Sequence, residues 1–233
     1  KGERLLVATD EKEDIDNKRN RLGIMSLDGI SKPLDILGSL GKVSPDETRI
    51  AVAGTEGATI FSLDGRDPIV LEPGRKQGTG VGALAWSPDG THVAYMSKGS
   101  VQGRGTHSIV VYEIATRQSL RLLEDAHLRR STGHMVLDWM EPDTLLYIRS
   151  QTNPNYSSST WSSGPRSTLT ELWALEEAST HSSVEAAQII HTWPVDRING
   201  LIHGGSRIVL SKTRDLQDVW FVDLGQPSVR TQV

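Results

Sequence analysis

The stretch Trp86-Ser87-Pro88-Asp89-Gly90-Thr91-His92-Val93-Ala94-Tyr95 decides the fold of this chain. Its Ser-Pro-Asp-Gly core places serine, proline and glycine at the first, second and fourth positions of a four-residue turn. Proline presets the backbone φ, and the serine and aspartate side chains bond to neighbouring backbone groups, so these residues predict a type I turn. An apolar run follows, which predicts that the turn leads into a β-strand.

The same turn and strand recur along the chain. Ser-Pro-Asp-Glu occupies 44–47, Glu-Pro-Asp at 141–143 is a reduced copy, and Gly-Gly fills the corresponding place at 204–205. Each turn precedes a pair of short runs rich in β-branched and aromatic residues, as expected for a strand hairpin. The hairpins are taken to begin 44, 43, 53 and 62 residues apart, at Arg4, Thr48, Thr91, Thr144 and Ser206. A period of roughly 40 to 50 residues built from strands alone is typical of a β-propeller, and long loops account for the longer intervals.

Each repeat contains four predicted strands. An inner strand precedes the turn at 83–86, 135–139 and 200–203, and an outer strand follows the hairpin at 68–71, 119–123, 187–190 and 228–233. The first hairpin has no inner strand ahead of it, so we expect nineteen of twenty strands. The sequence therefore predicts one all-β propeller domain over 1–233, with four-stranded blades at about 1–37, 38–74, 80–124, 134–191 and 195–233. Either the C-terminal strand closes a ring of five blades, or this chain is part of a propeller with six or more.

The turn and strand together resemble the repeats of TolB-type, WD40-like β-propellers. The resemblance rests on 86–95, which is similar to the Trp-Ser-Pro-Asp-Gly signature of that family, and on the Ser-Leu-Asp-Gly endings at 26–29 and 62–65. It implies a propeller that usually has six blades and a bacterial, extracytoplasmic setting. The repeats at 134–191 and 195–233 lack the full turn motif, so the resemblance carries a fold rather than a specific function.

Composition excludes several classes of protein. The 233 residues include 25 Lys and Arg against 29 Asp and Glu, a net charge of −4 that gives no reason to expect nucleic acid as a partner. The chain has no cysteine, which excludes a disulfide scaffold, a thiolate metal site and a cysteine nucleophile. No apolar stretch is long enough for a transmembrane segment.

No metal or cofactor site is predicted. The acidic segment 10–16 lacks the glycine of a calcium loop, and the histidines lack the close spacing of zinc ligands. The glycine-rich segments 78–82 and 99–105 precede strands rather than helices, so they are not phosphate loops.

Partner contacts are predicted in two segments. A stretch of Ser, Thr, Asn, Gly and Pro at 151–167 is long for a loop, and exposed aromatic and arginine side chains commonly dominate binding energies. We therefore predict contact residues there and in a small basic patch near Arg121: Tyr156, Trp161 and Arg166, then Arg129 and Arg130. Trp86, Trp139, Trp173 and Trp220 are instead expected to pack in the core.

The preferred interpretation is a non-enzymatic scaffold or sensor propeller that binds a protein or peptide through its loops. One alternative is the gating propeller of a prolyl-oligopeptidase-like hydrolase, whose Gly-x-Ser-x-Gly elbow is absent from this sequence. A second is a glycan-binding or glycoside hydrolase propeller, which requires carboxylates that converge at the channel and has only Asp138 and Asp196 as candidates.

Overall fold

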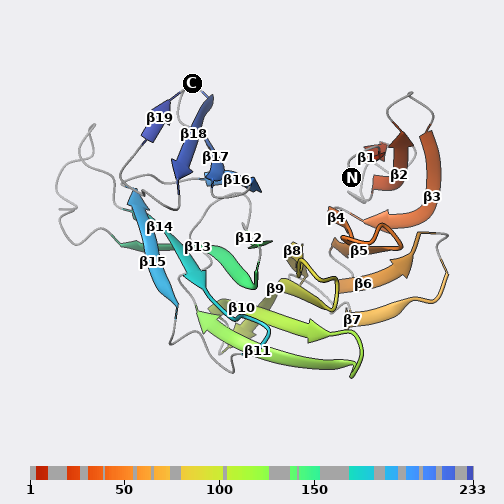
Figure 1. The fold of residues 1–233 in the computed structure, drawn as a ribbon. Helices are drawn as coiled ribbons and strands as arrows, with labels where there is room; N and C mark the ends of the chain where they lie inside the picture. The colour runs from red at the N-terminus through yellow and green to blue at the C-terminus, as the bar shows by residue number, and fades with distance from the viewer. Residues whose placement is uncertain are drawn as a thin grey trace.

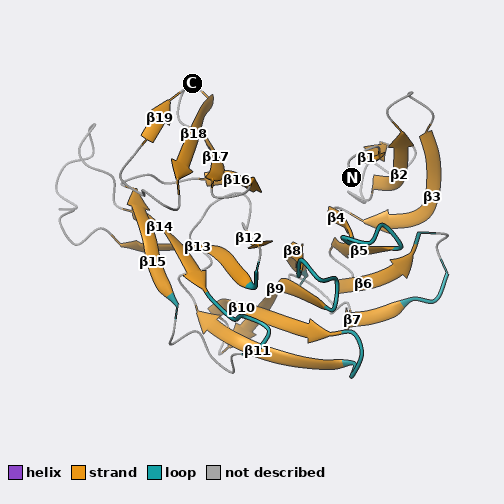
Figure 2. Ribbon diagram, in the orientation of Figure 1, coloured by secondary structure: helices purple, strands orange, loops and turns teal. Residues whose placement is uncertain are grey.

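Five antiparallel sheets make up the described part of the chain (Figure 1). This computed structural model describes residues 4–9, 20–26, 31–38, 40–54, 57–63, 66–73, 80–101, 104–125, 137–140, 142–152, 168–180, 187–193, 198–204, 207–213, 217–223 and 230–232. Figure 2 shows that these residues form strands and the turns that join them.

Each sheet is one blade, numbered here in chain order. Blade 1 contains β1 (Arg4–Thr9), β2 (Asn20–Ser26) and β3 (Ser31–Gly38). Blade 2 contains β4 (Leu40–Val43), β5 (Arg49–Gly54), β6 (Gly57–Ser62) and β7 (Ile69–Pro73). Blade 3 contains β8 (Val81–Trp86), β9 (His92–Val101), β10 (Arg104–Glu113) and β11 (Gln118–Asp125). Blade 4 contains β12 (Leu137–Met140), β13 (Thr144–Thr152), β14 (Thr168–Leu175) and β15 (Gln188–Trp193). Blade 5 contains β16 (Ile198–Gly204), β17 (Arg207–Thr213), β18 (Gln217–Asp223) and β19 (Arg230–Gln232).

The blades follow one another around an arc, with blade 1 and blade 5 at its two ends (Figure 1). Strands within each sheet lie in chain order, so every blade is a simple meander. The first strands of successive blades lie against one another on the inside of the arc: β8 against β4 and β5, β12 against β8 and β9, and β16 against β12. This radial arrangement confirms the prediction of an all-β propeller with four-stranded blades.

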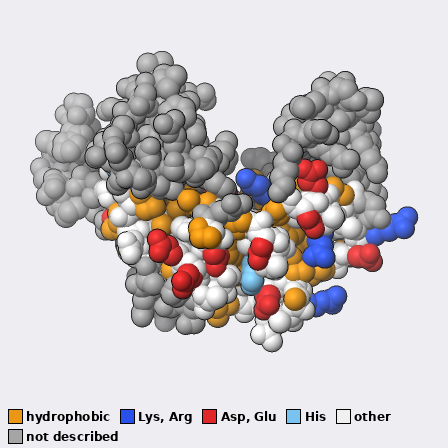
Figure 3. Space-filling model, viewed as in Figure 1, with side chains coloured by type: hydrophobic (Ala, Val, Ile, Leu, Met, Phe, Trp, Pro, Cys, Tyr) orange, Lys and Arg blue, Asp and Glu red, His pale blue; other side chains and the backbone are white. Residues whose placement is uncertain are grey.

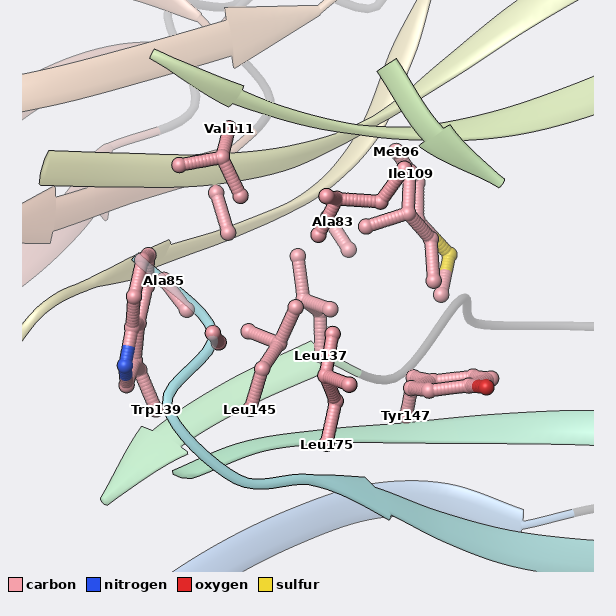
Figure 4. Packing of buried hydrophobic residues seen from close by; sticks show 13 residues of the cluster. Ala83, Ala85, Met96, Ile109, Val111, Leu137, Trp139, Leu145, Tyr147 and Leu175 are labelled. Carbon is pink, nitrogen blue, oxygen red and sulfur yellow. The ribbon is translucent and has the colours of Figure 1, made fainter. Parts of the chain in front are cut away.

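The hydrophobic core lies between blades rather than inside one. Successive residues of a strand point to opposite faces of its sheet, so each strand contributes to two interfaces. In β9, Val93 and Tyr95 are buried against blade 2, whereas Ala94 and Met96 are buried against blade 4. Figure 4 shows the second of these interfaces, in which Met96 of blade 3 faces Tyr147 of blade 4.

The two faces of blades 2 and 3 differ in the size of their residues. Each presents mainly alanines to the inner part of the following blade, and the facing residues of that blade are larger. Between blades 2 and 3 the alanines are Ala51, Ala53 and Ala58, and the larger residues include Leu84, Trp86, Tyr95 and Tyr112. Between blades 3 and 4 the alanines are Ala83, Ala85 and Ala94, and the larger residues include Leu137, Trp139, Leu145 and Tyr147. Small residues opposite large ones allow neighbouring blades to pack closely.

Two inner-strand tryptophans pack between blades, as predicted. Trp86 is buried between blades 2 and 3, and its indole Nε1–H donates a 2.8 Å hydrogen bond to the backbone oxygen of Lys42. Trp139 is buried between blades 3 and 4. Trp173 is half-buried beside the same cluster. The side chain of Trp220 lies outside the described residues.

The predicted Ser-Pro-Asp turns are held by their own side chains. The Ser87 hydroxyl donates a 2.6 Å hydrogen bond to Asp89 Oδ1 and accepts one of 2.8 Å from the His92 amide. Asp89 also accepts from the Thr91 amide and hydroxyl, and blade 2 repeats this pattern with Ser44, Asp46, Thr48 and Arg49. The carboxylates of Asp46 and Asp89 are therefore engaged in hydrogen bonds within their own turns.

Asp143 departs from that pattern. The turn of blade 4 is one residue shorter, and the Asp143 carbonyl accepts the bond that Thr48 and Thr91 accept in blades 2 and 3. Its carboxylate accepts a 2.8 Å bond from Trp139 Nε1 and further bonds from Ser179. The reduced motif therefore still forms a turn, but its aspartate carboxylate accepts hydrogen bonds from different residues. The sequence did not reveal this difference.

Candidate interaction face

Each blade has two ends with different connections. At the first, here called the turn end, the inner strand leads into the second strand and the third strand leads into the outer one. The described connections there are short, for example 44–48, 87–91 and 114–117. At the opposite end, called the loop end, the second strand leads into the third, and the outer strand leads to the next blade.

The loop end of blades 3 and 4 receives both segments in which partner contacts were predicted. β11 ends there at Asp125 and β12 begins there at Leu137, so the segment 126–136 joins the two blades at this end. β13 ends there at Thr152 and β14 begins opposite it at Thr168, so the segment 153–167 starts and finishes at the same end. The predicted contact residues themselves, Arg129, Arg130, Tyr156, Trp161 and Arg166, lie outside the described residues.

The two segments share an unusual charge composition. Segments 126–136 and 153–167 contain three arginines, two histidines and no aspartate or glutamate. The chain as a whole has an excess of carboxylates, with a net charge of −4. Antiparallel topology thus places the points of attachment of two carboxylate-free, arginine-containing segments at the same end of neighbouring blades.

The two strands to which segment 153–167 is attached, β13 and β14, carry an aromatic pair. Tyr147 on β13 and Trp173 on β14 are opposite each other in the register, and their ring centroids are 6.2 Å apart with an interplanar angle of 17°. Tyr147 is buried against blade 3, and Trp173 is half-buried at the edge of the same interface. Stacked cross-strand pairs of this kind stabilise the pairing of two strands.

Two charged residues extend this ladder by one step toward the loop end. Arg149 and Glu171 are opposite each other in the register, and the Arg149 guanidinium carbon lies 5.4 Å from the centroid of the Trp173 ring. Glu171 is 4% exposed, and its Oε2 accepts a 3.0 Å hydrogen bond from Trp173 Nε1. A buried carboxylate requires such partners because desolvation of its charge is unfavourable. We call Tyr147, Arg149, Glu171 and Trp173 the blade 4 ladder; sequence reasoning missed it as a unit.

Polar groups also join blades 2 and 3. The Ser97 hydroxyl donates a 2.7 Å hydrogen bond to Glu72 Oε1, and the Tyr95 hydroxyl donates a 3.3 Å bond to the Leu71 carbonyl. Burial raises the pKa of Tyr95 to about 12, and the nearby Glu72 carboxylate acts in the same direction. Tyr95 therefore remains neutral at physiological pH, where it acts as a structural donor.

The turn end has the opposite charge character on blade 4. Asp143, Glu176 and Glu177 lie at its described turns and are exposed or half-exposed. In the view of Figure 3, Asp and Glu side chains are visible in both halves of the described surface, whereas the visible Lys and Arg side chains lie toward blades 2 and 3. An acidic partner would therefore meet like charge at this end of blade 4.

The polar groups near His92 form a chain that does not provide a nucleophile. The Thr91 hydroxyl lies 2.7 Å from His92 Nδ1 and donates a 2.7 Å bond to Asp89 Oδ2. Because its proton is directed to Asp89, Thr91 can only accept from His92, which places a proton on Nδ1. A nucleophilic hydroxyl would instead donate to the histidine.

Of the two carboxylates considered for a glycoside hydrolase, the structure describes only one. Asp138 is half-buried and opposite the fully buried Leu146 in the register, on the face of β12 that points away from blade 3. Asp196 lies outside the described residues. Among the residues that the structure describes, no three His, Asp or Glu side chains are grouped so that they could hold a metal ion.

One further observation concerns membranes. Within the described ranges, no helix has the length and apolar character needed to cross one.

Comparison with solved structures identifies the fold. TolB from Acinetobacter baumannii superimposes with a TM-score of 0.65 at 14% identity, over 98% of this chain and 52% of TolB. An oligogalacturonate lyase in complex with manganese has a TM-score of 0.58 at 12% identity, over 99% of this chain and 62% of the lyase. The β-propeller domain of the trilobed protease from Pyrococcus furiosus has a TM-score of 0.58 at 12% identity, over 96% of this chain and 66% of that domain.

These similarities and the radial blades define a β-propeller. In particular, the fold is TolB-like, which confirms the resemblance carried by the Trp-Ser-Pro-Asp-Gly stretch. The chain spans between about half and two thirds of the three structures named. No protein-family model matches it, and no curated protein matches it in sequence. The neighbours include TolB, a lyase and a protease propeller, so the shared fold does not select one activity.

Proposed function

We propose that the protein is a non-enzymatic interaction module that binds a partner protein or peptide at the loop end of blades 3 and 4. The observation that supports this proposal is that the strands flanking segments 126–136 and 153–167 begin or end at that end of the blades. These segments contain Arg129, Arg130 and Arg166 and the aromatic residues Tyr156 and Trp161. Arginine and aromatic side chains are the residue types most enriched among binding hot spots.

The charge distribution indicates the chemistry of the partner. The two segments contain arginines and no carboxylate, whereas the described turn end of blade 4 carries Asp143, Glu176 and Glu177. A partner that presents carboxylates is therefore attracted to the loop end and repelled from the turn end of the same blade. The blade 4 ladder stabilises the pairing of β13 and β14, the two strands to which segment 153–167 is attached.

The experiment compares three versions of the protein as bait for proteins of its native host. The first is unchanged, the second carries Arg129→Ala, Arg130→Ala and Trp161→Ala, and the third carries Glu176→Ala and Glu177→Ala at the turn end. We expect a partner recovered by the unchanged protein to be retained by the third and lost by the second. Its binding should also weaken as salt is raised from about 0.05 to 0.5 M. Equal recovery by all three versions would refute this binding site.

A second candidate function is that of a propeller attached to a hydrolase. It is supported by the similarity to the trilobed protease propeller, which is a likeness of fold at 12% identity. The discriminating observation is the sequence on either side of 1–233 in the complete gene product. An adjoining hydrolase domain with a Gly-x-Ser-x-Gly elbow would favour this function over the scaffold.

A further inference from the structure

His107 on β10 is a titratable residue buried between two blades. It is 9% exposed, and it alternates along β10 with Ile109 and Val111, which belong to the cluster between blades 3 and 4. Because alternate residues of a strand share one face of the sheet, His107 also points toward blade 4. Histidine is the side chain whose charge ordinarily changes between about pH 5 and 8, so its burial links this interface to pH.

The apolar contacts of the interface end at one level toward the loop end. On blade 3 the last apolar pair is Met96 and Ile109, which are opposite each other in the register. On blade 4 the pair at that level is Tyr147 and Trp173. Figure 4 shows Met96 and Ile109 beside Tyr147, so the two pairs face each other across the interface. None of these four side chains is charged at physiological pH.

One step further toward the loop end lies a layer of charged and titratable residues, here called the polar layer. Its pair on blade 3 is Lys98 and His107. Its pair on blade 4 is Arg149 and Glu171, two members of the blade 4 ladder. Asp125 on β11 occupies the register place on the other side of His107. Arg149 is half-buried and Glu171 is 4% exposed, so the layer holds buried charge as well as a buried imidazole.

The formal charges around a neutral His107 cancel. Lys98 and Arg149 are positive, whereas Glu171 and Asp125 are negative. A proton on His107 would add one positive charge without a matching negative one, at a place where desolvation makes charge unfavourable. When the layer opens to water, the imidazole is hydrated and the same proton is accepted without this cost.

We propose that His107 is a pH-sensitive switch between blades 3 and 4: the neutral imidazole keeps the polar layer closed, and protonation opens it. Closure is complete above the ordinary pKa of histidine, about 6.5, and is lost as pH falls below it, because only the opened state gains the proton. Strands β11 and β13 lead from this layer into segments 126–136 and 153–167, so the switch acts where those segments are attached. Weaker binding of the loop-end partner in mild acid would follow; that consequence rests on the proposed function, whereas the switch itself does not.

The test measures hydrogen exchange of the 233-residue protein by NMR at pH 7.5 and 5.5, one unit on either side of about 6.5. Each rate is expressed as a protection factor, which removes the intrinsic effect of pH on exchange. Protection of amides 149–151 and 169–171, at the loop end of β13 and β14, should be about tenfold lower at the acidic pH. Amides 145–146 and 174–175, at the turn end of the same strands, should change by less than about twofold.

Two variants remove the titrating group, His107→Gln with a polar side chain and His107→Phe with an apolar ring, so that the test does not depend on one variant folding. In both, protection at the loop end should no longer depend on pH. The matched control is His92→Gln at the turn end of β9, which should keep the full pH response of the unchanged protein.

Three results would overturn the proposal. A pH response that survives in the His107 variants would assign it to another titratable group. Equal losses at both ends of β13 and β14 would show that acid weakens the blade as a whole. Greater protection at pH 5.5 would show that the protonated imidazole pairs with a carboxylate. No partner takes part in the experiment, so a failure of the loop-end binding site would leave its result unchanged.

Discussion

Glu47 and Gly90 occupy the same position in two copies of one turn, and both have a left-handed backbone, with φ of 58° and 71°. The amide of each donates a 2.9 Å hydrogen bond to the carbonyl of the serine three residues earlier. Glycine adopts this conformation without penalty, whereas the Cβ of glutamate makes it unfavourable. The two turns therefore have the same geometry but different backbone strain.

Glu47→Gly should raise the free energy of unfolding by about 0.5–1 kcal/mol, because relief of strain exceeds the added freedom of glycine in the unfolded chain. Glu47→Ala is the control; it keeps the Cβ and should change stability by less than about 0.5 kcal/mol. Gly90→Ala should lower stability by about 1 kcal/mol. A Cβ at Gly90 would lie 3.6 Å from Pro45 Cδ, an ordinary contact, so that loss would come from the backbone. Urea unfolding of the three variants measures these differences. If the Glu47→Gly protein were no more stable than the Glu47→Ala protein, the backbone of Glu47 would not be strained.

Gly38 on β3 should tolerate no larger residue while Val52 is present. A Cβ at Gly38 would overlap Val52 Cγ1, and Val52 is a buried β-branched side chain with little room to move. Gly38→Ala should therefore destabilise the protein by about 1–3 kcal/mol. Adding Val52→Ala should recover part of this loss, so that the double variant is more stable than the sum of the two single changes predicts. Strict additivity of the two changes would argue against this contact.

Trp86→Phe should lower the free energy of unfolding by about 1–3 kcal/mol, because the Lys42 carbonyl loses its donor and part of the ring volume is lost. Amides of both β4 and β8 should exchange faster, since the bond joins two blades. The control is Val70→Ala on the outer strand β7, where the side chain is 57% exposed and the change should be within about 0.5 kcal/mol. Faster exchange in β8 alone would mean that the bond does not couple the blades.

Acid should weaken the turns of blades 2 and 3. The hydrogen bond from Ser44 lowers the pKa of Asp46. Burial opposes ionisation of Asp89, but hydrogen bonds from Ser87 and Thr91 outweigh it and lower its pKa as well. A carboxylate with a lowered folded-state pKa contributes stability above its unfolded value, about 3.9, and loses that contribution as pH falls through the lower folded value.

The test of this effect compares the unchanged protein with Asp46→Asn plus Asp89→Asn by urea unfolding at pH 7 and pH 3. The double variant should be less stable at pH 7 and should lose less stability on acidification. If both proteins lost the same amount of stability between pH 7 and pH 3, carboxylates other than Asp46 and Asp89 would be responsible for the acid sensitivity.

Glu171→Ala should destabilise blade 4 by about 2–4 kcal/mol, because Trp173 Nε1–H loses its acceptor in a buried setting. Glu171→Gln keeps an acceptor and should be less harmful. In a double-mutant cycle, Glu171→Ala and Arg149→Ala should show a coupling of at least about 0.5 kcal/mol, as expected for residues opposite each other on one sheet face. The near-ultraviolet circular dichroism of the tryptophans would report whether the ring of Trp173 reorients. Additive single changes would mean that the ladder is not a unit.

Much of the fold follows from the sequence because turn chemistry is local. The predicted hairpin starts at Thr48, Thr91 and Thr144 lie within one residue of the observed starts of β5, β9 and β13. Strand β4 was implied only by the count of blades, since Leu-Gly-Lys-Val has little apolar alternation. It is a strand because β5 and β8 lie beside it. Tertiary context of this kind is not visible in a four-residue stretch.

The candidate site was less accessible to sequence reasoning. Segments 126–136 and 153–167 are attached at the same end of the blades because of the directions of β11, β12, β13 and β14. Those directions follow only when every strand of blades 3 and 4 has been assigned. The blade 4 ladder depends on register, because Arg149 and Glu171 are 22 residues apart in the sequence and adjacent in the sheet. A charged residue two places from an aromatic on each of two paired strands was the available signal.

The alternation of small and large residues gives the array of blades a direction. In the inner part of blades 2 and 3, a sheet presents mainly alanines to the following blade and larger residues to the preceding one, so neighbouring blades fit in head-to-tail order. A tandem copy of blade 3 could therefore dock after itself, whereas an inverted copy would oppose bulk to bulk. Growth of such a protein by duplication of whole blades is sterically permitted in one orientation and blocked in the other.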